Sequence, residues 1–138
     1  SACGLISNRL NIKNYLLGMN ISKQLIGKLG ESAVAEYLLE RGFRILDRNW
    51  RIKEGEIDLV VKSPSGKVHF VEVKTRSSLA FGHPLEAIDR DKAHRLQKLA
   101  LAWLVTNQHF GRDYQVDVAS VTLSRSMQAT IDYRAGVL

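Results

Sequence analysis

The sequence predicts an α/β fold in one domain, with a helix followed by three strands, a second helix and two further strands. Apolar residues recur with helical spacing in two stretches, around 22–41 and 89–107. Short β-branched runs, bounded by turn residues, lie between and after these stretches. A length of 138 residues with 45% apolar content suits a single compact core.

The N-terminal residues 1–20 have no regular apolar spacing, and we expect them to form a partly ordered arm before a single domain over 21–138. The first predicted helix runs from about Ser22 to Arg41, and Gly42 is a typical residue for its end. Its broad apolar face consists of Leu25, Ile26, Leu29, Ala33, Val34, Tyr37 and Leu38.

Two carboxylates of this helix, Glu31 and Glu36, lie on opposite flanks of the apolar face. Helical spacing alone does not choose between them as a functional group, and both also suit a solvated flank. Gly27 and Gly30 each weaken the helix by roughly 1 kcal/mol relative to alanine. Their presence indicates close approach of another backbone or a nearby ligand.

The next segment, 43–51, reads as a first strand with the sequence FRILDRNWR. Arg48 and Arg51 flank the aromatic Trp50, an arrangement that suits contact with phosphate and a base. Packing of Trp50 in the core or at a sheet edge is the alternative, and it is the commoner role of such a residue.

The centre of the chain is a predicted hairpin. Its first strand, 57–61, is apolar except for Asp58, and the turn residues 63–66 follow. In the second strand, 68–75, a period of two places Phe70, Glu72 and Lys74 on one face. Charged side chains in half-buried strands are costly unless they are paired or bind a metal.

Asp58, Glu72 and Lys74 together have the chemistry of a metal-dependent hydrolytic site. Carboxylates on adjacent strands bind hard cations such as Mg²⁺, and the Val73 carbonyl is a further possible ligand. A lysine on the same face stands where it can orient a water molecule or stabilise a phosphate. A structural ion pair of Glu72, either with Lys74 or with an arginine of the next strand, is the alternative interpretation.

The second predicted helix begins at about Asp89 or Asp91 and ends near Asn107, after a loop rich in turn residues. Its apolar stripe consists of Ile88, Leu96, Leu99, Ala100, Trp103 and Leu104. Lys92, Arg95 and Lys98 form a basic side that suits either a phosphate track or a solvated face. Residues 114–123 and 129–133 are the last two predicted strands.

The charge of the chain favours a polyanionic partner. Twenty Lys and Arg against 14 Asp and Glu give a net charge of +6 and a pI near 9.7, as in many nucleic-acid-binding proteins. A single cysteine fits a reducing compartment, and no apolar run reaches membrane-spanning length. We therefore expect a cytoplasmic protein without membrane contact. The four histidines lack zinc-ligand spacing.

The motifs GEIDL at 55–59 and FVEVKTR at 70–76 resemble those of the PD-(D/E)XK nuclease superfamily. The chain is most similar to the bacterial YraN family of uncharacterised, endonuclease-like proteins, which are related to archaeal Holliday junction resolvases. Further matching positions are Gly30-Glu31, Ala35, Tyr37-Leu38, Gly42, Asn49-Trp50-Arg51, Phe81-Gly82, Pro84, Lys92, Arg95-Leu96 and Asp117-Val118. Ile57 replaces the proline of the superfamily motif.

The resemblance implies a restriction-endonuclease-like αβββαβ core, in which helices flank a mixed central sheet. It implies that Asp58 and Glu72 are metal ligands and that Lys74 is the catalytic lysine. It also implies that Glu31, rather than Glu36, is the helix carboxylate that reaches the metal or its water. Glu56 is an alternative or auxiliary acid on the face of Asp58.

The leading expectation is a Mg²⁺- or Mn²⁺-dependent endonuclease that cuts nucleic acid, with branched or damaged DNA as the expected substrate. A non-catalytic nucleic-acid-binding or recruitment module on the same scaffold, and a purely structural interaction protein, are the alternatives. A homodimer is compatible with the resolvase comparison. Expected phosphate contacts are Lys28, Arg48, Arg51, Arg76, Lys92 and Arg95.

Overall fold

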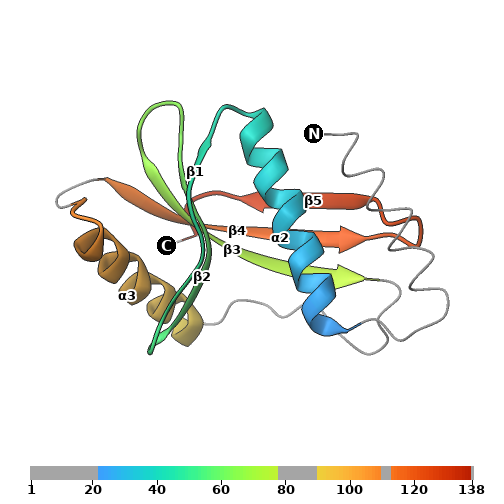
Figure 1. The fold of residues 1–138 in the computed structure, drawn as a ribbon, viewed down its shortest axis with the longest axis horizontal. Helices are drawn as coiled ribbons and strands as arrows, with labels where there is room; N and C mark the ends of the chain where they lie inside the picture. The colour runs from blue at the N-terminus through green and yellow to red at the C-terminus, as the bar shows by residue number, and fades with distance from the viewer. Residues whose placement is uncertain (1–21, 78–89, 110–112, 138) are drawn as a thin grey trace.

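The computed structural model describes residues 22–77, 90–109 and 113–137, which form a five-stranded mixed sheet between two helices (Figure 1). The expected N-terminal arm lies outside these residues. The order of the elements confirms the predicted fold class. In chain order they are α2 (Lys23–Glu40), β1 (Arg44–Ile52), β2 (Gly55–Lys62), β3 (Val68–Ser77), α3 (Arg90–Thr106), β4 (Tyr114–Leu123) and β5 (Ala129–Arg134).

The strands lie side by side in their order along the chain, from β1 to β5. β1, β2 and β3 form an antiparallel meander. β3 and β4 pair in parallel, which requires the crossover connection that contains α3. β5 returns antiparallel to β4 and forms one edge of the sheet, while β1 forms the other.

Among the described residues, one helix covers each face of the sheet. α2 begins at the N-cap residue Ser22, whose Oγ accepts a hydrogen bond from the Leu25 backbone N–H at 3.1 Å. It packs Ile26, Val34 and Leu38 on one face of the sheet. The helix is followed by Gly42, which has a φ of +84°, as expected for a residue that ends a helix.

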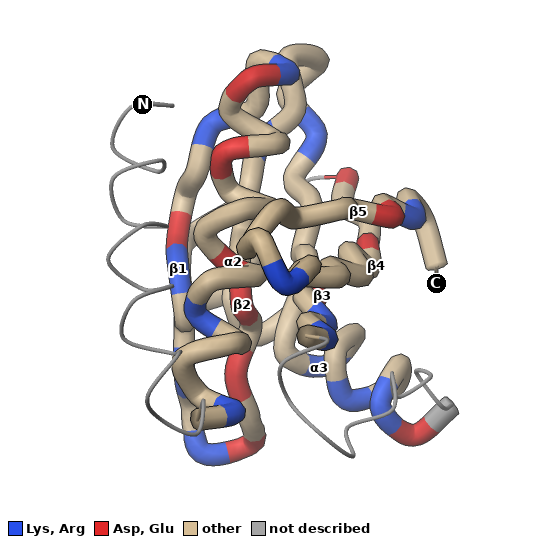
Figure 2. Tube along the Cα trace, turned by 90° about the vertical axis from the view of Figure 1, so that its right-hand side faces the viewer, with Lys and Arg blue, Asp and Glu red and all other residues tan. Residues whose placement is uncertain are grey.

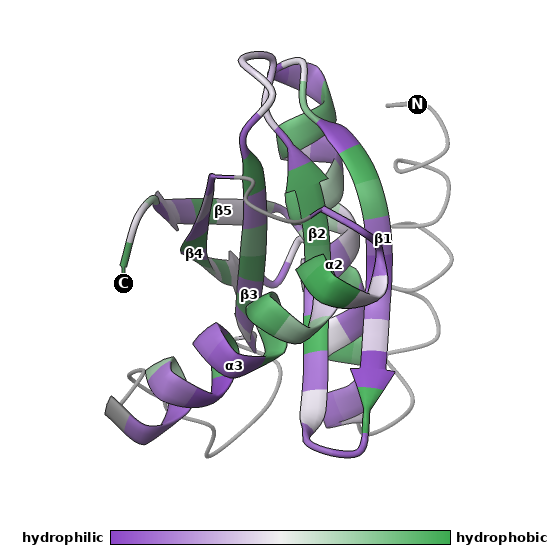
Figure 3. Cartoon of the chain, turned by 90° about the vertical axis from the view of Figure 1, so that its left-hand side faces the viewer, coloured by the Kyte–Doolittle hydropathy of each residue, from purple (hydrophilic) through white to green (hydrophobic). Residues whose placement is uncertain are grey.

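The other face carries α3. Its buried residues are those of the predicted stripe that the structure describes, namely Leu96, Leu99, Ala100, Trp103 and Leu104. They pack on Ile57, Val60 and Phe70, and Trp50 lies partly buried against the same cluster. Figure 3 shows apolar positions along β2 and β3, and it shows α3 changing from polar near its start to apolar near its end, where Leu101 and Val105 are exposed. Trp50 is therefore a packing residue.

β2 changes its packing partners at Asp58. Ile57 lies in the core beneath α3, whereas Leu59 and Val61 lie in the core beneath α2. Simple alternation would place residues 57, 59 and 61 on one face. The pairing of β2 with β3 runs from Lys62 back to Leu59, while the pairing of β2 with β1 extends to Gly55. β2 thus separates from β3 at Asp58, and this opens the central sheet.

A buried carboxylate secures the other half of the sheet. Asp117 is fully buried in β4, and its oxygens lie 2.7 Å from His69 Nδ1 and accept hydrogen bonds from Tyr133, Gln115 and the Gly136 N–H. Burial alone would raise the pKa of Asp117, but these partners hold it below its usual value. Since they come from β3, β4, β5 and the C-terminal segment, Asp117 ties these parts together.

Neither helix in the described part of the chain is long and apolar enough to cross a membrane.

Candidate active site

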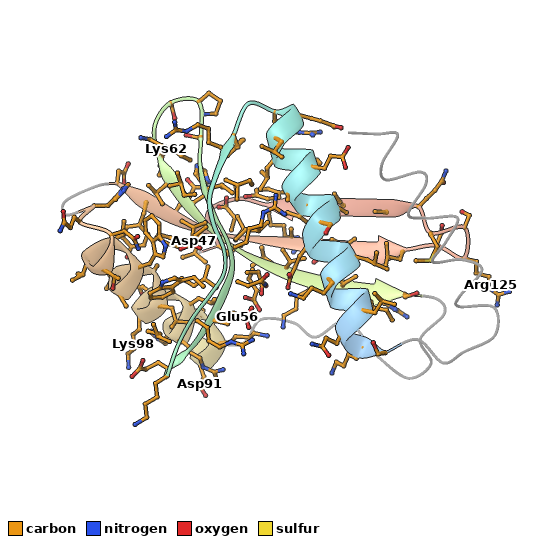
Figure 4. All side chains as sticks on the ribbon, in the orientation of Figure 1. Asp47, Glu56, Lys62, Asp91, Lys98 and Arg125 are labelled. Carbon is orange, nitrogen blue, oxygen red and sulfur yellow. The ribbon has the colours of Figure 1, made fainter. Side chains whose placement is uncertain are left out.

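Charged side chains from four elements converge where β2 separates from β3. α2 contributes Glu31, β2 contributes Glu56 and Asp58, β3 contributes Glu72 and Lys74, and α3 contributes Lys92. In Figure 4 the labelled Glu56 lies beside the β1–β2 ribbon on the side that faces α2. We call this group of four carboxylates and two lysines the acidic cluster.

Asp58 lies at the centre of the acidic cluster. Burial raises the pKa of its carboxyl group to about 8, and the neighbouring charges of Glu72, Glu31 and Glu56 act in the same direction. The Val73 N–H donates to Asp58 Oδ2 at 2.8 Å and opposes this shift. The site therefore concentrates negative charge around a half-buried carboxyl group.

Glu72 is buried and has two ammonium partners. Its Oε1 lies 3.5 Å from Lys74 Nζ and 3.5 Å from Lys92 Nζ. The Glu72–Lys74 ion pair considered from the sequence is therefore present. Burial lowers the pKa of Lys92, and the adjacent Lys74 lowers it further, while the Glu72 charge opposes the change.

The position of Lys92 was not foreseen. The sequence suggested only that this residue lies on a basic side of the second helix, among phosphate contacts. The structure places it at the first turn of α3, directly against a carboxylate of β3. The position of Lys92 relative to the apolar stripe could not predict its contact with Glu72, because this contact depends on how α3 packs against β3.

Asn49 of β1 is a second residue at the site that sequence reasoning missed. Its Nδ2 donates to Glu31 Oε2 at 2.9 Å and to Glu56 Oε1 at 3.0 Å. Lys28 Nζ donates to its Oδ1 at 3.4 Å. Asn49 also has a φ of +49°, which is uncommon for a residue other than glycine. The matching Asn-Trp-Arg motif was the signal that could have drawn attention to it.

Glu56 lies at the edge of the acidic cluster. Arg51 Nη2 donates to Glu56 Oε2 at 2.7 Å, and this hydrogen bond lowers the pKa of Glu56 against the smaller opposing effect of burial. The Arg51 side chain remains 75% exposed. Arg51 is thus engaged with an acidic residue of the site while it also faces solvent.

Of Glu31 and Glu36, the two carboxylates of α2 considered from the sequence, Glu31 is the one that accepts a hydrogen bond from Asn49 and whose charge raises the pKa of Asp58. Arg48, Arg76 and Arg95, which the sequence suggested as phosphate contacts, are exposed. Figure 2 shows basic positions on α2, β1 and α3 around the acidic positions of β2. A basic surface therefore borders the acidic cluster.

The carboxylates of the acidic cluster are held by protein donors and ammonium groups. Within residues 22–77, 90–109 and 113–137, no three His, Cys, Asp or Glu side chains are arranged to hold a metal ion. Glu72 faces two lysines, Glu31 and Glu56 share Asn49, and Asp58 accepts from Val73. Any cation would have to replace some of these contacts.

The described part of the chain is an α/β protein with a mixed sheet flanked by two helices, an aspartate on one central strand and Glu-x-Lys on the next. The chain belongs to the uncharacterised protein family UPF0102, whose family model matches residues 30–121. This confirms the family resemblance seen in the sequence.

Relatives in this family match nearly the whole of their own length. The chain is 43% identical to a UPF0102 protein of Beutenbergia cavernae over 116 residues, or 84% of this chain and 98% of that protein. It is 44% identical to one of Trichlorobacter lovleyi, covering 80% and 87%. It is 37% identical to one of Mycolicibacterium smegmatis, covering 88% and 99%.

Among solved structures, the chain is similar to Pyrococcus furiosus SfsA in complex with Ca²⁺, with a TM-score of 0.40 and 19% identity over 84% of this chain and 65% of that one. It also matches a repair endonuclease from Pyrococcus abyssi, with a TM-score of 0.36 and 12% identity, covering 77% and 40%. The EndoMS–dsDNA2 complex matches with a TM-score of 0.34 and 14% identity, covering 64% and 34%. These scores are too low to bear on function.

Proposed function

We propose that the chain is a divalent-cation-dependent endonuclease that hydrolyses phosphodiester bonds of nucleic acid. The observation that supports this proposal is the acidic cluster itself. Three carboxylates from three elements surround Asp58, and two lysines lie against Glu72 at the point where the central strands separate. A fold that needed only stability would gain little from such a concentration of like charge.

The chemical type of the donors in the acidic cluster suits a hard cation such as Mg²⁺ or Mn²⁺, which would bind by displacing some of the present contacts of the carboxylates. Carboxylate and carbonyl oxygens are the ligands that these ions prefer. The raised pKa of Asp58 reflects burial first and then repulsion by Glu72, Glu31 and Glu56, and a cation would relieve the repulsion. Asp58, Glu72, the Val73 carbonyl and Glu31 would hold the ion, which supplies Lewis-acid activation of water and of the phosphate when bound.

The residues of the chain would then act on the substrate directly. Lys74, which now lies 3.5 Å from Glu72, would orient the attacking water or stabilise charge on the phosphate. Lys92 lies at the same distance from the same oxygen and would bind a phosphate oxygen from the side of α3. Glu31 would accept a hydrogen bond from water at the cation, and Glu56 would serve as an auxiliary acid.

The basic surface supports a nucleic-acid substrate. The net charge of +6 and the exposed arginines around the site favour phosphate backbone contacts. We propose DNA as the substrate, with branched or damaged duplexes as the structures to test first. Expected contacts are Lys28, Arg48, Arg51, Arg76, Lys92 and Arg95. A homodimer would offer two such sites to a branched substrate.

A non-catalytic nucleic-acid-binding module is the second candidate function. The observation that favours it is the charge pairing, because Lys74 and Lys92 face Glu72 and Arg51 faces Glu56. In such a module these pairs would be structural. Binding would then need no cation and would survive the loss of Asp58.

The deciding experiment measures cleavage of labelled duplex, flap, four-way junction and single-stranded DNA with Mn²⁺, Mg²⁺ or EDTA. Asp58→Ala and Lys74→Ala should each lower the cleavage rate by at least about a thousandfold. Lys98→Ala, on the exposed side of α3, is the matched charge control and should cleave like the wild type. Salt-sensitive DNA binding without cleavage in either metal would reject the nuclease in favour of the binding module.

A further inference from the structure

We propose that Asn49 is a positioning residue that holds Glu31 in the acidic cluster. By doing so, it sets the affinity of the acidic cluster for a divalent cation. This inference rests on the proposed function. Its first basis is geometric, because one amide nitrogen donates to two carboxylates of different elements, at 2.9 Å to Glu31 and 3.0 Å to Glu56. A primary amide has two N–H donors, and Asn49 uses both in this way.

The backbone of Asn49 is the second basis. Its φ of +49° lies in the left-handed region, which asparagine tolerates better than most residues. The register of β1 with β2 does not shift here, because Arg48 pairs with Leu59 and Trp50 with Ile57. The unusual φ therefore does not serve to accommodate an inserted residue in the strand pairing. It accompanies a side chain that reaches across to α2.

The chemistry of an amide suits this position. Glu31 and Glu56 both raise the pKa of Asp58, so the two carboxylates and Asp58 repel one another. An arginine or lysine in place of Asn49 would hold Glu31 and Glu56 but would also neutralise the negative field. The amide holds them without adding charge, which keeps the cluster attractive to a cation.

This arrangement also explains how a carboxylate of α2 becomes part of a site built on the sheet. Glu31 is supplied by a helix that packs on the sheet through its apolar residues, and these contacts do not specify the rotamer of Glu31. The hydrogen bond from Asn49 supplies that constraint from β1. Lys28, one turn earlier on α2, donates to the amide oxygen at 3.4 Å and fixes the orientation of the amide.

The test is Asn49→Gly, because glycine keeps the left-handed backbone conformation and removes the side chain that carries the amide. The matched control is Gln108→Gly, which alters another residue of positive φ, at +59°, beyond the far end of α3 from Lys92. Mn²⁺ affinity is measured by titration calorimetry and Tm by circular dichroism in EDTA. We expect Asn49→Gly to weaken Mn²⁺ binding about 10- to 100-fold, with a Tm change no larger than that of the control.

A second measurement tests whether Asn49 acts through Glu31. In a Glu31→Gln background, Asn49→Gly should weaken Mn²⁺ binding by much less than it does in the wild type, because the carboxylate that it positions is already gone. Additive losses would show that Asn49 acts independently of Glu31 and would overturn the proposal.

The remaining outcomes are distinct. Unchanged Mn²⁺ affinity in Asn49→Gly, or a fall in Tm as its only effect, would make Asn49 a residue of the fold and refute the inference. A wild type that binds no Mn²⁺ would refute it together with the cation-dependent nuclease. Weakened Mn²⁺ binding in Asn49→Gly, with no DNA cleavage by the wild type, would support the inference while rejecting the nuclease.

Discussion

Asp58 destabilises the folded protein when it is ionised, and the ionised form is the one that the proposed cation binding requires. In the folded protein its pKa is about 8, compared with an ordinary value of 3.8. Between these values the folded state retains a proton that the unfolded chain releases, so this group lowers the free energy of unfolding as pH rises from about 4 to 8. The cost arises from burial and from the surrounding carboxylates, both of which disfavour the ionised form.

Asp58→Asn is therefore expected to stabilise the cation-free protein. The amide can still accept the hydrogen bond from Val73, and it removes one negative charge from the cluster. We expect a gain of about 1–3 kcal/mol above pH 8 and almost none near pH 4. The gain is smaller than the full pKa shift would give, because water reaches part of the site. Urea unfolding in EDTA at pH 4.5, 7 and 9 measures it. Equal stability of both proteins at pH 9 would contradict the repulsion argument.

Lys92 offers a second test at the residue scale. Because Glu72 retains Lys74 when Lys92 is removed, Lys92→Ala should fold normally. We expect kcat/KM to fall about 10- to 100-fold through loss of a charge beside the reacting phosphate. Lys98→Ala, which removes a charge from the same helix, is expected to stay near the wild-type value. If both variants behaved alike, Lys92 would be one of many surface phosphate contacts.

At the scale of elements, α2 determines whether Glu31 reaches the sheet. The sequence suggested that both Gly27 and Gly30 mark a close approach, but this holds for Gly30 alone. A Cβ at Gly30 would lie 1.8 Å from Thr75 Oγ1 of β3, whereas a Cβ at Gly27 would meet nothing within 4 Å. The helix therefore rests on β3 at the residue immediately before Glu31.

The two glycines form a matched pair of variants. Gly30→Ala should displace α2 from β3 and lower the free energy of unfolding by roughly 2–3 kcal/mol. Gly27→Ala should raise it by about 0.5–1 kcal/mol, since alanine favours the helix and nothing obstructs it. Thermal unfolding and urea titration measure both. A Gly30→Ala protein as stable as the wild type would show that α2 does not depend on this close contact.

For the whole molecule, charge governs the predicted association with DNA. If about six basic side chains contact phosphates, the affinity should fall about a thousandfold between 50 and 200 mM salt. Fluorescence anisotropy with a labelled duplex or junction measures the dependence in EDTA, where cleavage is absent. Each phosphate-contact variant, such as Arg48→Ala, should reduce the slope of log affinity against log salt by about one. A slope near zero would argue against nucleic acid as the partner.

The helices, the strands and the face shared by Phe70, Glu72 and Lys74 followed from the sequence alone. These features depend on local patterns, because the side-chain period of a helix or strand shows which residues are buried together. The residue types at Asp58, Glu72 and Lys74 led us to expect a hydrolytic site, since a charged side chain in an apolar strand is costly unless it is paired or binds a metal.

Tertiary structure alone decided which distant groups meet there. The change of packing in β2 at Asp58, the joining of Glu31 to Glu56 through Asn49, and the approach of Lys92 to Glu72 all join segments far apart in the chain. Local periodicity carries no information on these contacts, because they arise when two helices pack on opposite faces of a sheet whose central strands separate. The sequence thus determined the helices, the strands and the charged residue types in them, while packing determined which of these residues come together in the acidic cluster.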